Sequence, residues 1–392
     1  MIKISFRRNM RYLVFLFVYY YIRQILGMVM SKVVHFSESL TLNFLMFFGE
    51  FFGGLAIILY HKLSFYKKRE KTYYFGKTST LGSIQLIQNQ AQMNNIDGFF
   101  KIHLLIFFVA FFDFNEFLIS NLIPEIAIIS PTSDQRLRII ITIISSLLCT
   151  FTLRLKTGKH HTFSLIGMGI CSFIIFIMEL IYKMKGIHLG NFIVAHLLVF
   201  CRLAFVSLID VTEKYLVEYN FIDKFRVLST EGFFGIIFCL IYSFIISKNP
   251  IIEIDKAYQK LDVGKKILLI IFLVLYFVLS AACNIYKITC NIVYNPMAKS
   301  LPAYFFNPFF MIYYFIFEND FTIEGKRNYF YFIINLILSI IIDAFAAIYN
   351  EFFILNCFGL QKDTHYGIAE RALDNSVTEL DAIEHINSLE KD

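Results

Sequence analysis

The feature that most constrains this chain is a series of long apolar runs, each long enough to cross a lipid bilayer as a helix. A crossing helix needs about 20 mainly apolar residues. Only 17% of the 392 residues are charged and the mean hydropathy is +0.63, whereas soluble domains carry about 25% charged residues. We therefore predict an all-α polytopic membrane protein with about ten transmembrane helices. The expected spans lie near 11–33, 39–60, 102–122, 133–153, 162–182, 190–211, 228–247, 266–288, 298–317 and 329–355.

The Lys and Arg residues between the spans predict the orientation. Ten spans put both termini on one side, and cytosolic segments normally carry the excess of positive charge. With both termini in the cytosol, the cytosolic segments before the tail hold 19 Lys and Arg, against ten on the opposite face. The first run follows a basic stretch and has no small-residue cleavage site after it, so we interpret it as a signal anchor. Orientation also accounts for the net charge of +6, and no nucleic-acid partner is expected.

A short internal echo indicates two related halves. The second span contains Gly49-Glu50-Phe51-Phe52-Gly53, and the seventh contains Glu231-Gly232-Phe233-Phe234-Gly235, with the Phe-Phe-Gly elements 182 residues apart. Two five-helix repeats would give this offset. Because five is odd, such repeats have opposite orientations in the membrane, as in many transporters.

The expected organisation has four parts. Residues 1–10 form a cytosolic N-terminus, 11–182 the first five-helix repeat, 190–355 the second repeat, and 356–392 an acidic cytosolic tail. The first repeat includes a long cytosolic loop at 62–100. Its basic cluster could contact anionic lipid or a partner, but we favour a disordered loop. In the tail, Leu380–Leu389 could form a short amphipathic helix.

Charged residues at membrane depth are the candidates for function, because each is costly there unless it faces protein or water. Asp113 and Glu116 are three residues apart, so one helix face presents both. The alternative is that these residues pair with Arg138 or Arg202 and only fix the helix packing. The expected substrate-pathway residues are Glu50, Asp113, Glu116, Arg138, Asp210 and Glu231. The remaining charges at this depth are Arg136, Glu179, Arg202 and Asp343.

Enzyme chemistry is disfavoured by the motifs. His196 and His103 have no recognisable companion motif, and His160-His161 is most simply interfacial. The seven cysteines form no CxxC pair, so neither a disulfide framework nor a thiolate metal site is indicated. No phosphate-binding glycine loop, zinc spacing or nucleophile elbow is present. We expect no catalytic residue, no metal site and no cofactor.

Four separated patches resemble the drug/metabolite transporter (EamA-like) superfamily, in its nucleotide-sugar-transporter-like solute-carrier branch. The patches follow the family's order and together cover about residues 10–355. The first, Met46–Phe51, is similar to the second-span Met-Phe-x-Gly-Glu signature, and the second, Ala110–Phe117, has Asp113 at the third-span acidic position. The third, Ser133–Lys159, is similar to the fourth-span Gln-x-Leu-Arg segment through Gln135, Leu137 and Arg138. The fourth joins Glu213-Lys214, similar to the sixth-span exit, with Glu231–Gly235, similar to the seventh-span Glu-Gly-x-Phe-Gly.

The chain departs from this family at identifiable positions. Ile139 replaces the small residue that usually follows the fourth-span Arg, and the ninth span lacks the corresponding Arg and carries Lys299 instead. The motifs that dedicated nucleotide-sugar carriers show near the last two spans are absent. The resemblance therefore carries over the fold but not a nucleotide-sugar substrate.

The resemblance implies a ten-helix bundle of two inverted repeats that transports a small, anionic or nucleotide-like metabolite by alternating access. Arg138 would contact an anionic solute, and Asp113 would be the solute-contacting or proton-coupling carboxylate. Glu50 and Glu231 would be structural or solute-contacting. Family analogy places the protein in an endomembrane compartment such as the Golgi or lysosome. The expected partners are a small-molecule solute and the lipid bilayer, and a homodimer is left open. The alternative is a non-transporting scaffold or receptor that keeps the carrier fold. A membrane enzyme, which would need His196 in the central cavity, ranks third.

Overall fold

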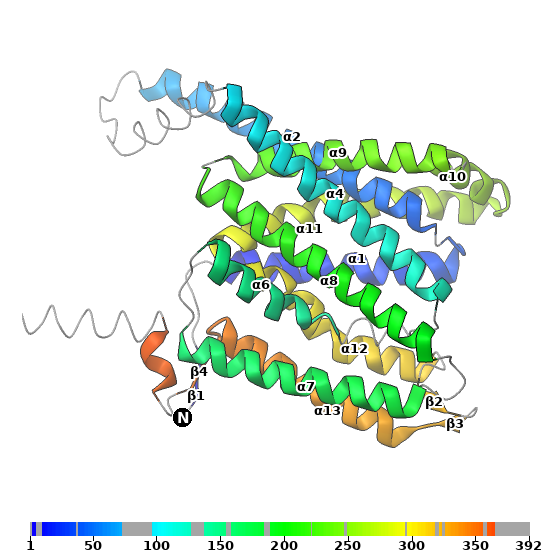
Figure 1. Ribbon diagram of the computed structural model, residues 1–392. Coiled ribbons are helices and arrows are strands. Elements are labelled where there is room, and N and C mark those ends of the chain that lie inside the picture. The colour runs from blue at the N-terminus through cyan, green and yellow to red at the C-terminus, as the bar shows by residue number, and fades with distance from the viewer. Residues whose placement is uncertain are drawn as a thin grey trace, which may run out of the picture.

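The chain folds into a bundle of long helices that run roughly parallel or antiparallel to one another (Figure 1). The computed structural model describes residues 2–4, 10–36, 38–72, 96–126, 137–153, 158–183, 189–220, 222–246, 249–294, 296–317, 321–323, 326–355 and 359–364. The helices are α1 Met10–Val33, α2 Ser39–Thr72, α4 Ile96–Ile126, α6 Ile140–Thr152, α7 Lys159–Lys183, α8 Leu189–Glu218, α9 Lys224–Ile245, α10 Pro250–Gln259, α11 Val263–Val293, the 3-10 turn η1 Pro296–Ser300, α12 Leu301–Phe317, α13 Tyr329–Tyr349 and the 3-10 turn η2 Leu360–Asp363.

Nine helices in the described parts of the chain are long and apolar enough to cross a membrane. The chain is thus an all-α, multi-pass integral membrane protein, as its apolar runs predict. The tenth expected span, 133–153, appears as the shorter helix α6. Its 13 residues extend about 20 Å at 1.5 Å per residue, less than the roughly 30 Å of a hydrocarbon core. Residues 133–136 lie outside the described part.

The two described ends of the chain meet at one end of the bundle. Strand β1 (Ile2–Ile4) pairs antiparallel with β4 (Phe353–Leu355), with Lys3 opposite Ile354. In Figure 1 this pair and the end of α2 lie on the left, whereas α10 and the hairpin β2–β3 (Thr322–Ile323 and Lys326–Arg327) lie on the right. Ends on the same side fit an even number of crossings, and a tenth crossing stays a prediction.

The structure corrects three expected boundaries. Residues 62–72 continue α2 instead of beginning a loop, because helix-forming Lys, Arg and Glu residues follow the apolar run without a Pro or Gly. Residues 96–100 already belong to α4. The last span ends at Tyr349, since Glu351 has a left-handed backbone (φ 60°) and the chain then enters β4. Residues 73–95 and the Leu380–Leu389 segment lie outside the described residues.

Helix α10 was not expected from the sequence. Asn249 caps it, because its side-chain oxygen accepts a hydrogen bond from the Ile251 amide at 2.9 Å, and Pro250 occupies its first turn. Because polar and apolar residues alternate irregularly along its ten residues, α10 has no apolar run that would predict a membrane span.

The principal helix pairs are α2 with α9, α4 with α8, α1 with α11, α2 with α11 and α7 with α13. Helices α2 and α9 cross closely because glycines lie at the crossing. A Cβ atom at Gly232 would stand 2.5 Å from the Phe51 amide nitrogen and 2.7 Å from the Phe47 carbonyl oxygen. The two Phe-Phe-Gly segments therefore pack against each other, in the way that small residues allow in membrane helices.

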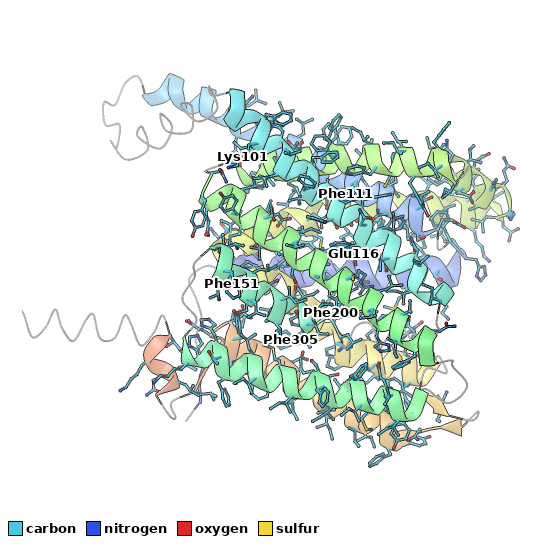
Figure 2. The ribbon with its side chains drawn as sticks, in the orientation of Figure 1. Lys101, Phe111, Glu116, Phe151, Phe200 and Phe305 are labelled. Carbon is cyan, nitrogen blue, oxygen red and sulfur yellow. The ribbon has the colours of Figure 1, made fainter. Side chains whose placement is uncertain are left out.

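Apolar side chains also cover the outside of the bundle. Figure 2 labels Phe111 on α4, Phe151 on α6 and Phe200 on α8. These side chains are 40%, 79% and 49% exposed. Such a surface is unfavourable in water but is suited to lipid tails.

Candidate functional site

A polar cavity of about 270 Å³ lies inside the bundle. Residues of α1, α2, α4, α6, α8, α9, α11, η1 and α12 line it, together with the segment that leads into α6, so both predicted halves contribute. All six expected pathway residues lie on its wall. They are Glu50, Asp113, Glu116, Arg138, Asp210 and Glu231. Segments far apart in the sequence thus bring the charges of the membrane interior to one place.

Three carboxylates form a cluster in this cavity. One carboxylate oxygen from each of Glu50, Asp113 and Glu231 lies within 4.8 Å of the other two. Glu50 and Glu231 are buried, with 5% and 3% of their surface exposed. Among the described residues, one oxygen of each, Oε2, has no hydrogen-bond partner. The cluster can therefore accept protons or coordinate a cation, because carboxylates this close repel one another when all are ionised.

The local sequence explains how the cluster forms. Glu50 lies beside Gly49, which is close to the backbone of α11 at Phe277 and Ala281, and Glu231 precedes Gly232 at the crossing with α2. The glycines bring α2 close to α9 and α11, so that Glu50 and Glu231 can meet, and Asp113 comes from α4, which packs on α9. Asn284 on α11 fixes one member, because its side-chain amide donates to Glu50 Oε1 at 2.6 Å.

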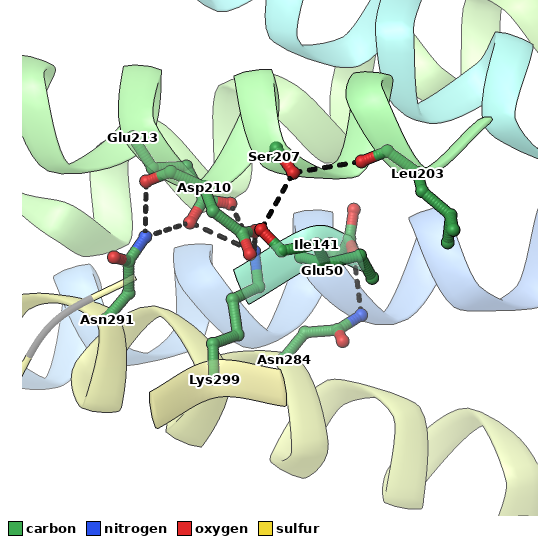
Figure 3. A network of polar contacts seen from close by, with 9 residues as sticks. All are labelled: Glu50, Ile141, Leu203, Ser207, Asp210, Glu213, Asn284, Asn291 and Lys299. Carbon is green, nitrogen blue, oxygen red and sulfur yellow. Dashed lines mark hydrogen bonds and ion pairs between the residues drawn. The ribbon is translucent and has the colours of Figure 1, made fainter. Parts of the chain in front are cut away.

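A second group of charges centres on Lys299 (Figure 3). The Lys299 ammonium nitrogen lies 2.7 Å from Asp210 Oδ1 and 3.1 Å from Glu213 Oε1. Asn291 donates from its side chain to Glu213 Oε2 and to the Asp210 carbonyl oxygen, both at 2.8 Å. The group joins α8 to the end of α11 and to η1.

A third polar group lies earlier on α8. Arg202 Nε is 3.4 Å from Glu116 Oε1, and Arg202 Nη1 donates to Ser120 Oγ at 3.3 Å. Asp210 follows Arg202 by eight residues, which is about 12 Å along the helix axis. The cavity therefore has charge pairs at two levels along α8, one of them with α4 and the other with η1.

Several functional candidates were not recognised from the sequence. Arg23 in the first span lines the cavity, is 8% exposed and has a buried Nη1 without a hydrogen-bond partner among the described residues. Lys287 and Lys299, which the charge count assigned to cytosolic segments, also line the cavity. Without these two, the cytosolic count falls from 19 to 17, still above the ten of the opposite face.

Other residues at membrane depth lie elsewhere. His196 and Glu179 form a pair, with His196 Nε2 3.4 Å from Glu179 Oε2. Neither belongs to the cavity wall, nor does Asp343.

Arg138 lines the cavity, and its carbonyl oxygen accepts a hydrogen bond from the Tyr304 hydroxyl at 3.2 Å. Gln135 and Arg136 lie outside the described residues.

In total, six carboxylates and five basic side chains line the cavity. The carboxylates are Glu50, Asp113, Glu116, Asp210, Glu213 and Glu231, and the bases are Arg23, Arg138, Arg202, Lys287 and Lys299. The cavity is thus polar, with nearly balanced charge, and lies within an integral membrane protein. No protein-family model matches the chain, and no curated protein matches it with significance.

Proposed function

We propose that this protein is a secondary transporter of a small, anionic or nucleotide-like metabolite, which it binds in the central cavity and releases by alternating access. The observation that carries the proposal is the cavity itself, a charged chamber at membrane depth whose wall comes from both halves of the chain. Buried charge of this kind is expensive in a bilayer and marks solute and ion pathways. A scaffold has no need of it, and a dry, packed midline would favour that alternative.

The proposed architecture is two inverted five-helix repeats, 11–182 and 190–355. The helix packing supports it. In this arrangement α1, α2, α4 and α7 correspond to α8, α9, α11 and α13. The counterpart of the α4–α8 pair is then α11–α1, and that of the α4–α9 pair is α11–α2. In both counterparts the two helices pack against each other in the structure. Exchanging the halves leaves α2–α9 and α7–α13 unchanged, as expected for helices beside a two-fold axis.

The wall of the cavity supports an anionic solute. Arg138 precedes α6, and Lys299 lies in η1 before α12, so each half contributes a basic residue just before its fourth helix. Lys299 is paired with Asp210 and Glu213, which leaves Arg138 as the proposed contact of the solute. Arg23 adds a buried guanidinium with an unused donor. Guanidinium groups bind carboxylates and phosphates through paired hydrogen bonds. A volume of about 270 Å³ is just under the usual 300–1,000 Å³ of small-molecule sites, which favours a small solute.

The carboxylate cluster is the proposed coupling element. Asp113 with Glu50 and Glu231 would take up protons or a cation on one side of the membrane and release them on the other, with Asp113 as the leading member. Glu116 and Asp210 lie in the flanking ion pairs, where separation of the partners would open the pathway. The proposed compartment, an endomembrane such as the Golgi or lysosome, rests on the family resemblance alone.

Ligand screening tests the proposal. Purified protein is heated with nucleotide sugars, nucleotides, amino acids and phosphorylated metabolites, since a ligand of the folded state raises the melting temperature by mass action. We expect at least one anionic class to stabilise the wild type but not Arg138→Ala. Stabilisation that is equal in the two proteins would argue against a solute contact at Arg138. No stabilisation by any class would favour the scaffold.

A further inference from the structure

A separate group of metal-ligating side chains lies at the end of the bundle where β1 and β4 pair. His160 and His161 begin α7, and Glu351 follows α13 by two residues, and these two helices pack against each other. One ligand atom from each of the three residues lies within 4.8 Å of the other two. None of them lines the transport cavity, so the group is independent of the proposed function.

The distance between two of these atoms is compatible with their binding one metal ion. His160 Nε2 lies 3.4 Å from Glu351 Oε1, beyond the 2.7–3.2 Å that is usual for N–H···O bonds. Two ligands bound at about 2.0–2.1 Å to a tetrahedral zinc ion would stand about 3.4 Å apart. The side chains thus already have the spacing of neighbouring ligands.

The state of His160 also points to an absent partner. The residue is 2% exposed, and neither of its ring nitrogens has a hydrogen-bond partner among the described residues. A buried imidazole nitrogen without a hydrogen bond is unfavourable. A cation held between His160 and Glu351 would give one of these ring nitrogens a partner.

The position of His161 allows it to complete the group. Its ring centroid is 3.9 Å from that of His160 and 4.7 Å from that of Tyr349, which it meets edge-on. Its Nδ1 accepts a hydrogen bond from the Gly158 amide at 3.1 Å. A metal bound to this ring would replace that contact or shift the imidazole proton, a change confined to the start of α7.

We propose that His160, His161 and Glu351 bind one divalent transition-metal ion, with zinc the best fit. Two imidazoles and one carboxylate are a zinc ligand set that leaves a fourth position for water. The ion would join α7 to α13, the last helix of each half, at the end of the bundle that carries the two described chain ends. The sequence-based expectation of no metal site came from searching for close motif spacing. This group joins residues 190 positions apart, as Glu351 and His161 are.

Cobalt titration tests this site. The full-length, tag-free protein is treated with chelator, and Co²⁺ is added while visible absorption and equilibrium dialysis are followed. We expect one Co²⁺ per chain, absorption bands of a four-coordinate ion, and loss of those bands on addition of Zn²⁺. His160→Gln and Glu351→Gln should each weaken binding at least about tenfold, because each removes a direct ligand.

His196→Gln is a matched control. His196 Nε2 lies at the same 3.4 Å from a glutamate oxygen, that of Glu179, but no further His, Cys, Asp or Glu completes a metal-binding group there among the described residues. It should therefore leave the Co²⁺ bands unchanged. Folding of every variant is checked by gel filtration and circular dichroism. If His160→Gln does not fold, Glu351→Gln and His161→Gln decide the question. A folded wild type that binds no Co²⁺ or Zn²⁺ stoichiometrically would overturn the proposal, as would binding that folded ligand variants retain in full.

Discussion

The Lys299 ammonium nitrogen lies 2.7 Å from Asp210 Oδ1, which joins η1 to the membrane-spanning helix α8. The Asp210 side chain is 1% exposed and that of Lys299 13%. Glu213 shares the same ammonium group. Lys299 therefore neutralises two carboxylates that would otherwise be buried without a cation.

Removal of Lys299 should destabilise the protein strongly. Breaking a buried ion pair by deleting one partner costs about 3–5 kcal/mol, because the other charge stays buried and unpaired. We expect Lys299→Ala to lower the apparent melting temperature in detergent by several degrees. Lys299→Ala combined with Asp210→Asn should be less destabilised than the single variant, since one orphaned charge is then removed.

Lys256→Ala is the control for this experiment. Lys256 pairs with Glu253 on α10 at 3.3 Å, but its side chain is 61% exposed, and exposed pairs contribute about 0–1 kcal/mol. Its melting temperature should stay close to that of the wild type. If the two lysine variants melt alike, the Lys299 group does not stabilise the cavity as described.

The crossing of α2 and α9 should not tolerate a larger residue. At Gly232 an added Cβ would meet backbone atoms of Phe51 and Phe47 at 2.5 and 2.7 Å, which only separation of the helices can relieve. Overpacking costs about 1–3 kcal/mol, so Gly232→Ala should reduce thermal stability and solute binding together. Gly27→Ala in α1 has nothing within 4 Å of the new Cβ and should be neutral or slightly stabilising. Equal stability of the two variants would show that the helices do not cross this closely.

Much of the fold could be predicted because hydrocarbon thickness sets the length of an apolar run. That rule located the nine long apolar helices of the described residues. The same rule predicted helix ends inaccurately where polar residues continue the helix past the apolar run, as in residues 62–72 of α2. It also passed over α10, whose cap and proline are visible in the sequence but whose residues are not uniformly apolar.

The sequence predicted the acidic residues of the candidate site better than the basic ones. Carboxylates within apolar runs stand out, and all of those chosen line one cavity. Lys287 and Lys299 lie near the ends of predicted spans, so a charge count treats them as loop residues. Arg23 lies inside the first span, where a charge among apolar residues could have identified it. No rule of spacing could reveal that Asn284 donates to Glu50, since that contact depends on how α2 packs on α11.

Loss of the Asn284 amide should disturb the carboxylate cluster. Asn284→Ala removes the donor to Glu50 Oε1 at 2.6 Å, and leaving a buried acceptor unsatisfied costs about 1–3 kcal/mol. We expect lower thermal stability, with partial recovery when Glu50→Gln is added, because a neutral amide is less costly to bury than a carboxylate. A double variant that is no more stable than Asn284→Ala would contradict this coupling.

Both termini should be accessible from the same side of the membrane. The β1–β4 pair brings the two described chain ends together, and the excess of Lys and Arg predicts that this side is cytosolic. Epitope tags at either terminus should be cleaved by protease added to the cytosolic side, whereas a tag inserted between β2 and β3 should be protected. Termini on opposite sides would require an odd number of crossings and would exclude the β1–β4 pair.

The most direct test of the central claim is uptake into proteoliposomes of the solute that most stabilises the purified protein. Wild type is compared with Asp113→Asn, Arg138→Ala and the control Glu253→Gln, a residue of α10 outside the cavity wall. We predict saturable uptake by the wild type and the control, and uptake at least about tenfold lower in both cavity variants, equivalent to about 1.4 kcal/mol or more. Uptake that is unchanged by Asp113→Asn and Arg138→Ala, or a folded wild type that transports nothing, would contradict the account.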